Sequence, residues 1–209
     1  MNIVVLEHDD AEKFLSKEEF MKLFPLRFER YKNYKFANDR QRCLGVGVLL
    51  YEVLGLCEKD LYYNRLGKPL SKKGEMFSVS HSGDFVVLAS EKGLVGVDLE
   101  RMEKGYLDIM PQVFTAEETA FVNDDLKSFY QIWTLKESLL KAVEEDGDMP
   151  FNQISVLELI KGESIIYKGK TLYGGTRCFE QEEYVLSWVS DKKTNPRIIK
   201  LKNKNREVV

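Results

Sequence analysis

Two acidic residues alternate at the end of an apolar run, in the segment Gly96-Val97-Asp98-Leu99-Glu100. On a strand, residues two apart project from one face, so Asp98 and Glu100 would stand side by side. Adjacent carboxylates repel each other, and a hard divalent cation such as Mg²⁺ relieves that repulsion. Removing either acid would also remove this repulsion, so we expect the fold to stay intact without it. From the spacing alone, the better-supported alternative is two acids on the solvated face of an edge strand.

A third acid lies in the segment Trp133-Thr134-Leu135-Lys136-Glu137-Ser138-Leu139-Leu140-Lys141-Ala142. Trp133, Glu137 and Lys141 fall at i, i+4 and i+8, along one face of a helix. Glu137 is therefore a candidate third metal ligand, and Lys141 a candidate contact for an anionic ligand. Taken alone, the segment is better explained by an ordinary Glu–Lys surface pair beside a core tryptophan.

Histidine occurs only at positions 8 and 81, which nearly excludes histidine-based zinc sites. His81 is the candidate imidazole, because it follows Ser80 at the end of an expected strand, just before the turn Ser82-Gly83-Asp84. Neighbouring strand residues point to opposite faces, so Ser80 and His81 cannot pair as in a catalytic triad. A polar cluster at a strand end, without a ligand, is an equally good explanation.

Basic residues precede these motifs and would form a phosphate pocket if the fold gathers them: Arg27, Arg30, Arg40, Arg42 and Lys68. Taken individually, each is better explained as a solvated charge. Glu118 follows Thr115 by three residues, the spacing of a helix capping box. The sequence contains no glycine-rich dinucleotide loop, no Walker A loop and no nucleophile elbow.

The composition is that of a globular protein, with 209 residues, 44% hydrophobic, 31% charged and a net charge of -3. This balance argues against nucleic-acid binding over the whole surface. Three cysteines without CxxC spacing indicate a reduced, cytoplasmic protein rather than a disulfide framework. The N-terminal segment lacks the basic region of a signal peptide, and the most apolar stretch is too short to span a membrane.

The elements that must position these residues alternate in an α+β pattern. We expect a strand at 2–6, long helices at 37–56 and 125–145, and strands at 76–80, 85–90, 94–100, 154–160, 164–173 and 183–190. Gly45 and Gly47 inside the first long helix indicate close packing there. The pattern predicts two similar halves, 1–103 and 104–209. The basic tail from Asp191 onward is expected to be solvated and frayed.

The ordered series GKP, SHS, GVDLE and W-x-x-K-E-S-x-x-K-A resembles the 4′-phosphopantetheinyl transferase superfamily, of the surfactin-synthetase-activating (Sfp) type. The resemblance runs from about Arg27 to Ala142. One departure is Ser78, where that family commonly has asparagine. The resemblance implies that the active site lies at the interface of the two halves of a monomer. It also implies transfer of 4′-phosphopantetheine from coenzyme A to a serine of an apo acyl or peptidyl carrier protein. Adenosine 3′,5′-bisphosphate leaves, and Mg²⁺ is required.

Carried over by position, the resemblance makes Asp98, Glu100 and Glu137 the metal ligands. It makes Glu137 the general base as well, and Lys141 the pyrophosphate contact. The implied coenzyme A contacts are Lys68, Ser80, His81, Arg27, Arg30 and Arg42, together with Lys141. Because the acceptor supplies the nucleophile, the chain needs no activated serine or cysteine of its own.

Two alternatives stay open from the sequence. One is another Mg²⁺-dependent phosphoryl or nucleotidyl transferase, which would share the carboxylates but bind a different nucleotide. The other is a non-catalytic homologue that binds a carrier protein. The sequence does not identify the cognate carrier protein.

Overall fold

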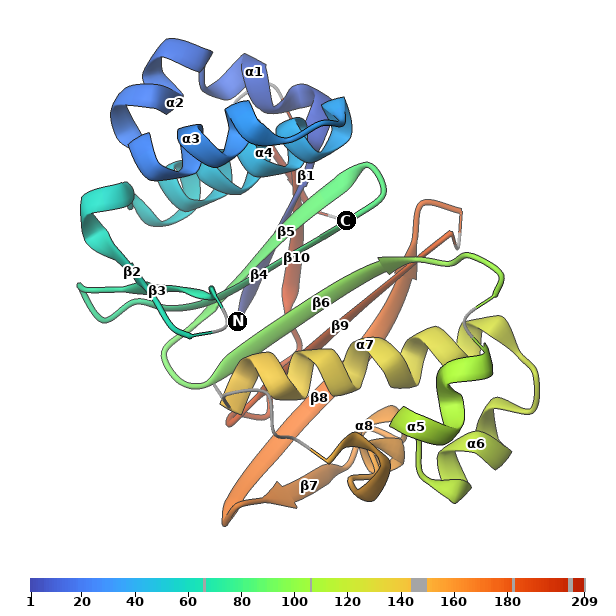
Figure 1. Cartoon of the computed structure of the whole chain (residues 1–209). Coiled ribbons are helices and arrows are strands. Elements are labelled where there is room, and N and C mark those ends of the chain that lie inside the picture. Colours follow the sequence, from blue (N-terminus) through green and yellow to red (C-terminus); the bar gives the residue numbers. More distant parts are fainter. Residues whose placement is uncertain (66, 106, 144–149, 182, 203–204, 209) are drawn as a thin grey trace. The chain divides into compact units, whose positions relative to one another are not determined.

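The structure is a computed structural model, and it describes every residue except 66, 106, 144–149, 182, 203–204 and 209. It is an α+β protein, as predicted, and it divides into two compact units (Figure 1). Unit 1 comprises Met1–Lys92 and Asn195–Val209, and unit 2 comprises Gly93–Thr194. Among the described residues, no helix is long and apolar enough to cross a membrane.

Unit 1 is a five-stranded sheet with helices packed against it, and its strand order is β11-β10-β1-β5-β4. All neighbouring strands are antiparallel except β1 and β10, which run parallel. Its strands are β1 (Asn2–Glu7), β4 (Met76–Ser82), β5 (Phe85–Glu91), β10 (Arg197–Lys202), β11 (Asn205–Val208) and the hairpin β2 (Leu61–Tyr63) and β3 (Pro69–Ser71). Its helices are α1 (Ala11–Phe14), α2 (Lys17–Leu23), α3 (Pro25–Asn33) and α4 (Ala37–Leu54).

Helix α4 forms the centre of the unit 1 core, and every residue from Cys43 to Leu50 is buried. Two glycines allow this packing. A β-carbon on Gly45 would lie 2.8 Å from a Val86 methyl, and one on Gly47 would lie 2.7 Å from the Phe20 ring. The close packing predicted at these glycines is therefore confirmed.

Unit 2 has an antiparallel sheet of order β6-β9-β8-β7, with the long helix α7 against one face. Its strands are β6 (Val95–Arg101), β7 (Ser164–Tyr167), β8 (Lys170–Phe179) and β9 (Tyr184–Ser190). Its helices are α5 (Met110–Val113), α6 (Ala116–Val122), α7 (Leu126–Val143) and α8 (Leu157–Ile160). The predicted helix 125–145 matches α7, except that residues 144–145 lie outside the described part of the chain.

The units divide at a different place from the predicted boundary between residues 103 and 104. Strand β6 pairs along its whole length with β9, from Val95 opposite Ser190 to Arg101 opposite Tyr184. The division therefore falls before Gly93, and β6 belongs to unit 2. Asp98 and Glu100 consequently lie in the same unit as Glu137, whereas the prediction placed them in the other half.

The basic C-terminal tail is not frayed as predicted, because it returns to unit 1 and joins its sheet. Strand β10 pairs with β1, and β11 pairs with β10. Apolar residues alternate with basic ones in this segment, and Ile198, Ile199 and Leu201 are buried. Their burial offsets the entropy lost when the tail becomes ordered.

Two further strand predictions need correction. The run 154–160 alternates like a strand, but it ends in the short helix α8. Short apolar runs do not distinguish strand from helix by periodicity alone. The run 164–173 is a hairpin of β7 and β8, because Lys168 and Gly169 have φ values of 48° and 74° and form a tight turn.

We predict that a chain ending at Thr194 fails to fold in unit 1. It would lose three buried aliphatic side chains, each contributing roughly 2–5 kcal/mol, against a typical net stability of about 5–15 kcal/mol. Thermal melting followed by circular dichroism should show the loss. Leu201→Ala in the full chain is the graded control, with a lower but cooperative transition. An unchanged melting temperature for the truncated chain would contradict this role of β10.

Candidate active site

Helix α7 contacts β6 directly at Gly96. A β-carbon on this glycine would lie 1.9 Å from the carbonyl oxygen of Ser138 and 2.6 Å from the backbone nitrogen of Ala142. Only glycine permits so close an approach. Asp98 and Glu100 project from the same face of β6 as Gly96, the face covered by α7. The strand and the helix therefore bring together the two motifs that the sequence singled out.

Asp98 is buried, so it is not an acid on a solvated strand face. It is 3% exposed, and its Oδ1 accepts a hydrogen bond from Lys141 Nζ at 2.6 Å. Charge-assisted bonds of this length are among the stronger hydrogen bonds in proteins. Removing Asp98 would therefore also remove its ion pair with Lys141. The expectation of an intact fold considered only the repulsion between carboxylates and not this pair.

Glu137 lies one helical turn before Lys141 and is half-buried. Burial raises the pKa of its carboxyl group, and the negative charge of Asp98 raises this pKa further, whereas Lys141 opposes the shift. Among the described residues, the structure gives the Glu137 carboxylate no hydrogen bond or ion pair. Glu137 is thus a carboxylate whose ionised form a nearby cation would stabilise.

The donor set is consistent with Mg²⁺ in its chemistry. Asp98, Glu100 and Glu137 supply only carboxylate oxygens, the ligands that hard cations prefer. The repulsion between Asp98 and Glu137 is the electrostatic condition that a bound cation relieves. Within the described part of the chain, however, no group of three histidine, cysteine or acidic side chains is gathered closely enough to hold a metal ion. The metal site stays a prediction.

A second buried ion pair supports α7 from its other side. Glu118 and Lys136 are fully buried, and their charged atoms are 2.8 Å apart. Lys136 also donates to the carbonyl oxygens of Phe151 and Ile154, at 2.6 and 2.5 Å. The predicted capping box of Glu118 with Thr115 is confirmed. Glu118 is therefore a structural residue, and Lys136, to which the sequence analysis gave no role, ties α7 to the segment that follows it.

In unit 1, Arg27 and Arg30 lie beside an acid and a tyrosine that the sequence did not reveal. Glu58 Oε2 accepts from the Arg27 backbone nitrogen at 3.0 Å, and Glu58 Oε1 accepts from the Tyr63 hydroxyl at 2.7 Å. The Arg30 guanidinium lies 5.0 Å from the centroid of the Tyr63 ring. The charge of Arg27 lowers the pKa of Tyr63, although burial raises it more. Arg27 thus contacts Glu58 through its backbone, and the charges of both arginines act on Tyr63.

The predicted alternation at the end of β4 is confirmed, because Ser80 is buried and His81 is exposed. Arg42 has partners within the fold, since its Nε donates to the Gly83 carbonyl at 2.9 Å and its Nη1 to Asp39 at 3.2 Å. It thereby holds the turn that follows β4. The Lys68 backbone nitrogen donates to the Asn64 side chain at 2.9 Å, which orders the start of β3.

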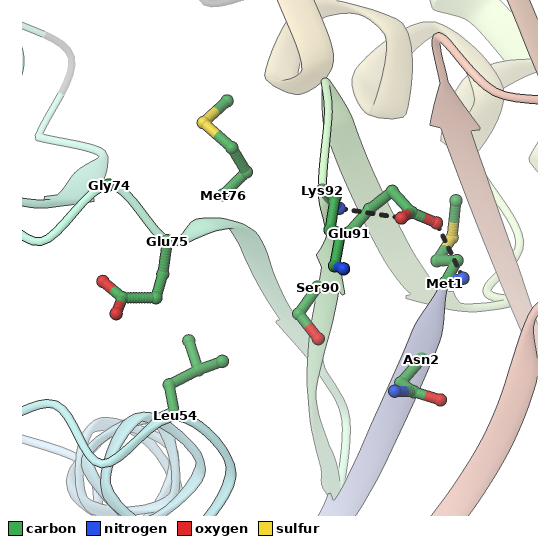
Figure 2. Close-up of a pocket in the computed structure, with 9 residues that line it drawn as sticks. All are labelled: Met1, Asn2, Leu54, Gly74, Glu75, Met76, Ser90, Glu91 and Lys92. Atoms are coloured by element: carbon green, nitrogen blue, oxygen red, sulfur yellow. Dashed lines mark hydrogen bonds and ion pairs between the residues drawn. The ribbon is translucent and has the colours of Figure 1, made fainter.

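A pocket of about 570 Å³ in unit 1 is lined by none of the predicted site residues. Figure 2 shows it between the end of α4, represented by Leu54, and the ends of β1 and β5, where Glu91 pairs with the Met1 amino group. A second pocket of about 540 Å³ is lined by Glu58 and Tyr63, among others. This second pocket therefore borders the hydrogen bond between Glu58 and Tyr63. An active site at the interface of two halves stays a prediction.

Comparison with known proteins shows which family the chain resembles. Residues 94–196 match the profile of the 4′-phosphopantetheinyl transferase superfamily. The 4′-phosphopantetheinyl transferase gsp of Aneurinibacillus migulanus is 31% identical over 153 residues, covering 68% of this chain and 62% of that protein. The 4′-phosphopantetheinyl transferase Sfp of Bacillus subtilis is 25% identical over 164 residues, covering 72% and 71%.

A solved structure, holo-[acyl-carrier-protein] synthase of Thermotoga maritima, is 13% identical with a TM-score of 0.34, covering 46% of this chain and 61% of that one. The profile match contains both motifs that meet at Gly96, namely GVDLE on β6 and W-x-x-K-E-S on α7. Over residues 94–196, and so over both motifs, the chain is similar to the 4′-phosphopantetheinyl transferase superfamily.

Proposed function

We propose that the chain transfers 4′-phosphopantetheine from coenzyme A to a serine hydroxyl of an apo acyl or peptidyl carrier protein. The serine oxygen forms a bond to the phosphorus that carries the pantetheine. The bond from this phosphorus to the bridging oxygen breaks, and adenosine 3′,5′-bisphosphate leaves. The single observation that carries the proposal is the meeting of Asp98, Glu137 and Lys141 where α7 contacts β6, within the region that matches the family.

Glu137 is proposed as the general base, directly or through water. Its raised pKa brings its basicity closer to neutral pH than that of an ordinary carboxylate. The side chain of Lys141 is partly exposed, at 26%, so a phosphate group can approach its ammonium. In that position Lys141 offsets the charge that develops on the leaving group.

Asp98, Glu100 and Glu137 are proposed to hold Mg²⁺. When bound, the ion would offset the negative charge of the pyrophosphate and polarise its oxygens. The carboxylates themselves fix which side of α7 receives the anionic substrate. Lys141, already beside Asp98, adds a positive charge on the same side.

The coenzyme A contacts other than Lys141 are proposed in unit 1. Arg27, Arg30, Lys68 and His81 supply positive or protonatable groups, and Ser80 supplies a hydroxyl. Arg42 is proposed to act mainly through the turn that it holds at Gly83. The chain is proposed to act as a cytoplasmic monomer, with no nucleic-acid or membrane partner.

The function is tested by incubating the chain with coenzyme A, Mg²⁺ and a panel of apo carrier proteins from fatty-acid, polyketide and peptide synthesis. Mass spectrometry should show pantetheinyl addition to at least one carrier. Retention of coenzyme A without transfer to any carrier would instead indicate a non-catalytic binding protein.

We predict that Glu137→Gln slows transfer about a hundredfold to ten-thousandfold, because glutamine keeps one oxygen ligand but loses the charge and the basicity. Coenzyme A affinity should fall far less, since the proposed phosphate contacts remain. Transfer rate and coenzyme A affinity are measured on the same variant. A near-normal rate would leave Glu137 without a catalytic role.

The same substitution should stabilise the metal-free protein at pH 7. The pKa of Glu137 is raised in the folded state, so stability falls as pH rises through the window between its ordinary and raised pKa. Glu137→Gln removes this penalty and should raise the melting temperature at pH 7, by about 2–4 °C for each kcal/mol removed, but not at pH 4. Glu117→Gln, at an exposed position on α6, is the control without a gain. An equal gain at both pH values would contradict the electrostatic origin.

We predict that His81→Ala weakens binding of coenzyme A more than binding of 3′-dephospho-coenzyme A. A charge-assisted hydrogen bond to phosphate contributes on the order of 1.5–3 kcal/mol, which is at least a tenfold change in affinity. Isothermal titration with both ligands measures the difference. Equal losses would place His81 away from the 3′-phosphate.

A further inference from the structure

Three buried hydroxyl groups connect α7 to β9 beneath the candidate site. Thr134 and Ser138 of α7 and Ser187 of β9 are all 0% exposed. The Thr134 and Ser187 hydroxyl oxygens are 2.6 Å apart, and the Ser138 hydroxyl donates to the Ser187 carbonyl at 3.0 Å. Burying a hydroxyl is unfavourable unless it is hydrogen-bonded, so these contacts favour one placement of the helix on the sheet.

Ser187 occupies a particular place in the sheet. It lies directly opposite Asp98 in the pairing of β6 with β9. Its two partners on α7, Thr134 and Ser138, lie three residues before and one residue after Glu137. One strand residue therefore sits beside Asp98 and also holds the helical turns that carry Glu137 and Lys141.

The donors and acceptors in these hydrogen bonds show what the loss of the Ser187 hydroxyl would leave unsatisfied. Thr134 also bonds to the Tyr130 carbonyl at 2.7 Å within its own helix. Because the Thr134 hydroxyl donates its proton to the Tyr130 carbonyl, the Ser187 hydroxyl is the donor in its bond to Thr134. Ser187→Ala then leaves no buried donor unsatisfied, because Thr134 keeps Tyr130 and Ser138 keeps the backbone carbonyl at position 187. The Ser187 hydroxyl is thus not required to satisfy its neighbours.

We infer that Ser187 is a positioning residue, which fixes Glu137 and Lys141 of α7 relative to Asp98 through its hydroxyl bond to Thr134. The inference rests on the proposed function of these three residues. Gly96 prevents α7 from moving closer to the sheet, because the Ser138 carbonyl already meets it. The hydroxyl bond resists the remaining movements, a rotation or a slide of the helix. Displacements of about 1 Å at reacting groups can cost a hundredfold in rate.

The test compares Ser187→Ala with Ser190→Ala in the full chain. Ser190 is the control on the same strand, because it is 1% exposed and projects from the opposite face of the sheet. Among the described residues, its hydroxyl bonds locally, accepting from the Lys192 backbone at 3.1 Å. Both variants should melt at similar temperatures. Ser187→Ala should raise the Mg²⁺ concentration for half-maximal transfer about tenfold, the low end of the effect of residues that orient metal ligands. The KM for coenzyme A should stay within about twofold, since all of its proposed contacts except Lys141 lie in unit 1.

Titration calorimetry with Mg²⁺ gives the same comparison without turnover. Thr134→Val should reproduce the loss of Mg²⁺ affinity, and Thr134→Ser, which keeps the hydroxyl, should restore it. Equal Mg²⁺ affinity in Ser187→Ala and Ser190→Ala would overturn the inference. So would a fall of many degrees in melting temperature with unchanged Mg²⁺ affinity, because that pattern is purely structural.

A failed transfer assay for the unsubstituted chain would defeat the proposed function but not this inference. Hydrogen exchange of the backbone amides of residues 137–142 then decides it. Faster exchange in Ser187→Ala than in Ser190→Ala supports the positioning of α7 by Ser187, and equal exchange overturns it.

Discussion

The chemistry proposed for unit 2 depends on the contact between the backbone of α7 and Gly96. Without a β-carbon at this position, the helix lies directly on β6, within the space that any other side chain would occupy. The acids of β6 face the helix, and Glu137 and Lys141 face back from it. Any larger residue at 96 would separate the two motifs. The glycine of GVDLE is therefore as much part of the candidate site as the two acids that follow it.

Burial then governs the charges in this region. Ion pairs inside a protein offset a desolvation cost only when their geometry is good, and removing one partner leaves an unfavourable buried charge. Glu118 has Lys136 at 2.8 Å, and Asp98 has Lys141 at 2.6 Å. These two pairs perform different tasks. The first is wholly enclosed and anchors α7, whereas the lysine of the second is partly exposed and so accessible to an anionic ligand.

The sequence predicted most of the elements because their signals are local. The capping box at Thr115 and the close packing of Gly47 follow from neighbouring residues. The return of the tail to β1 could not be predicted, because a parallel pairing of segments about 195 residues apart leaves no local pattern. For the same reason no local pattern assigns β6 to unit 2, since this assignment follows from its pairing with β9.

The candidate residues were found by motif, but their partners were not. Glu58 lies 31 residues from Arg27, and Ser187 lies 53 residues from Thr134, so no spacing rule connects them. The ion-pair partner of Lys141 could also not be predicted from the sequence. Spacing indicated a Glu137–Lys141 pair, yet the Lys141 ammonium bonds to Asp98. Lys136 is likewise paired with Glu118, so the described residues give the Glu137 carboxylate no ion pair, and burial raises its pKa. A carboxylate in that position favours an incoming cation or proton, which is the property that a metal ligand and a general base both require.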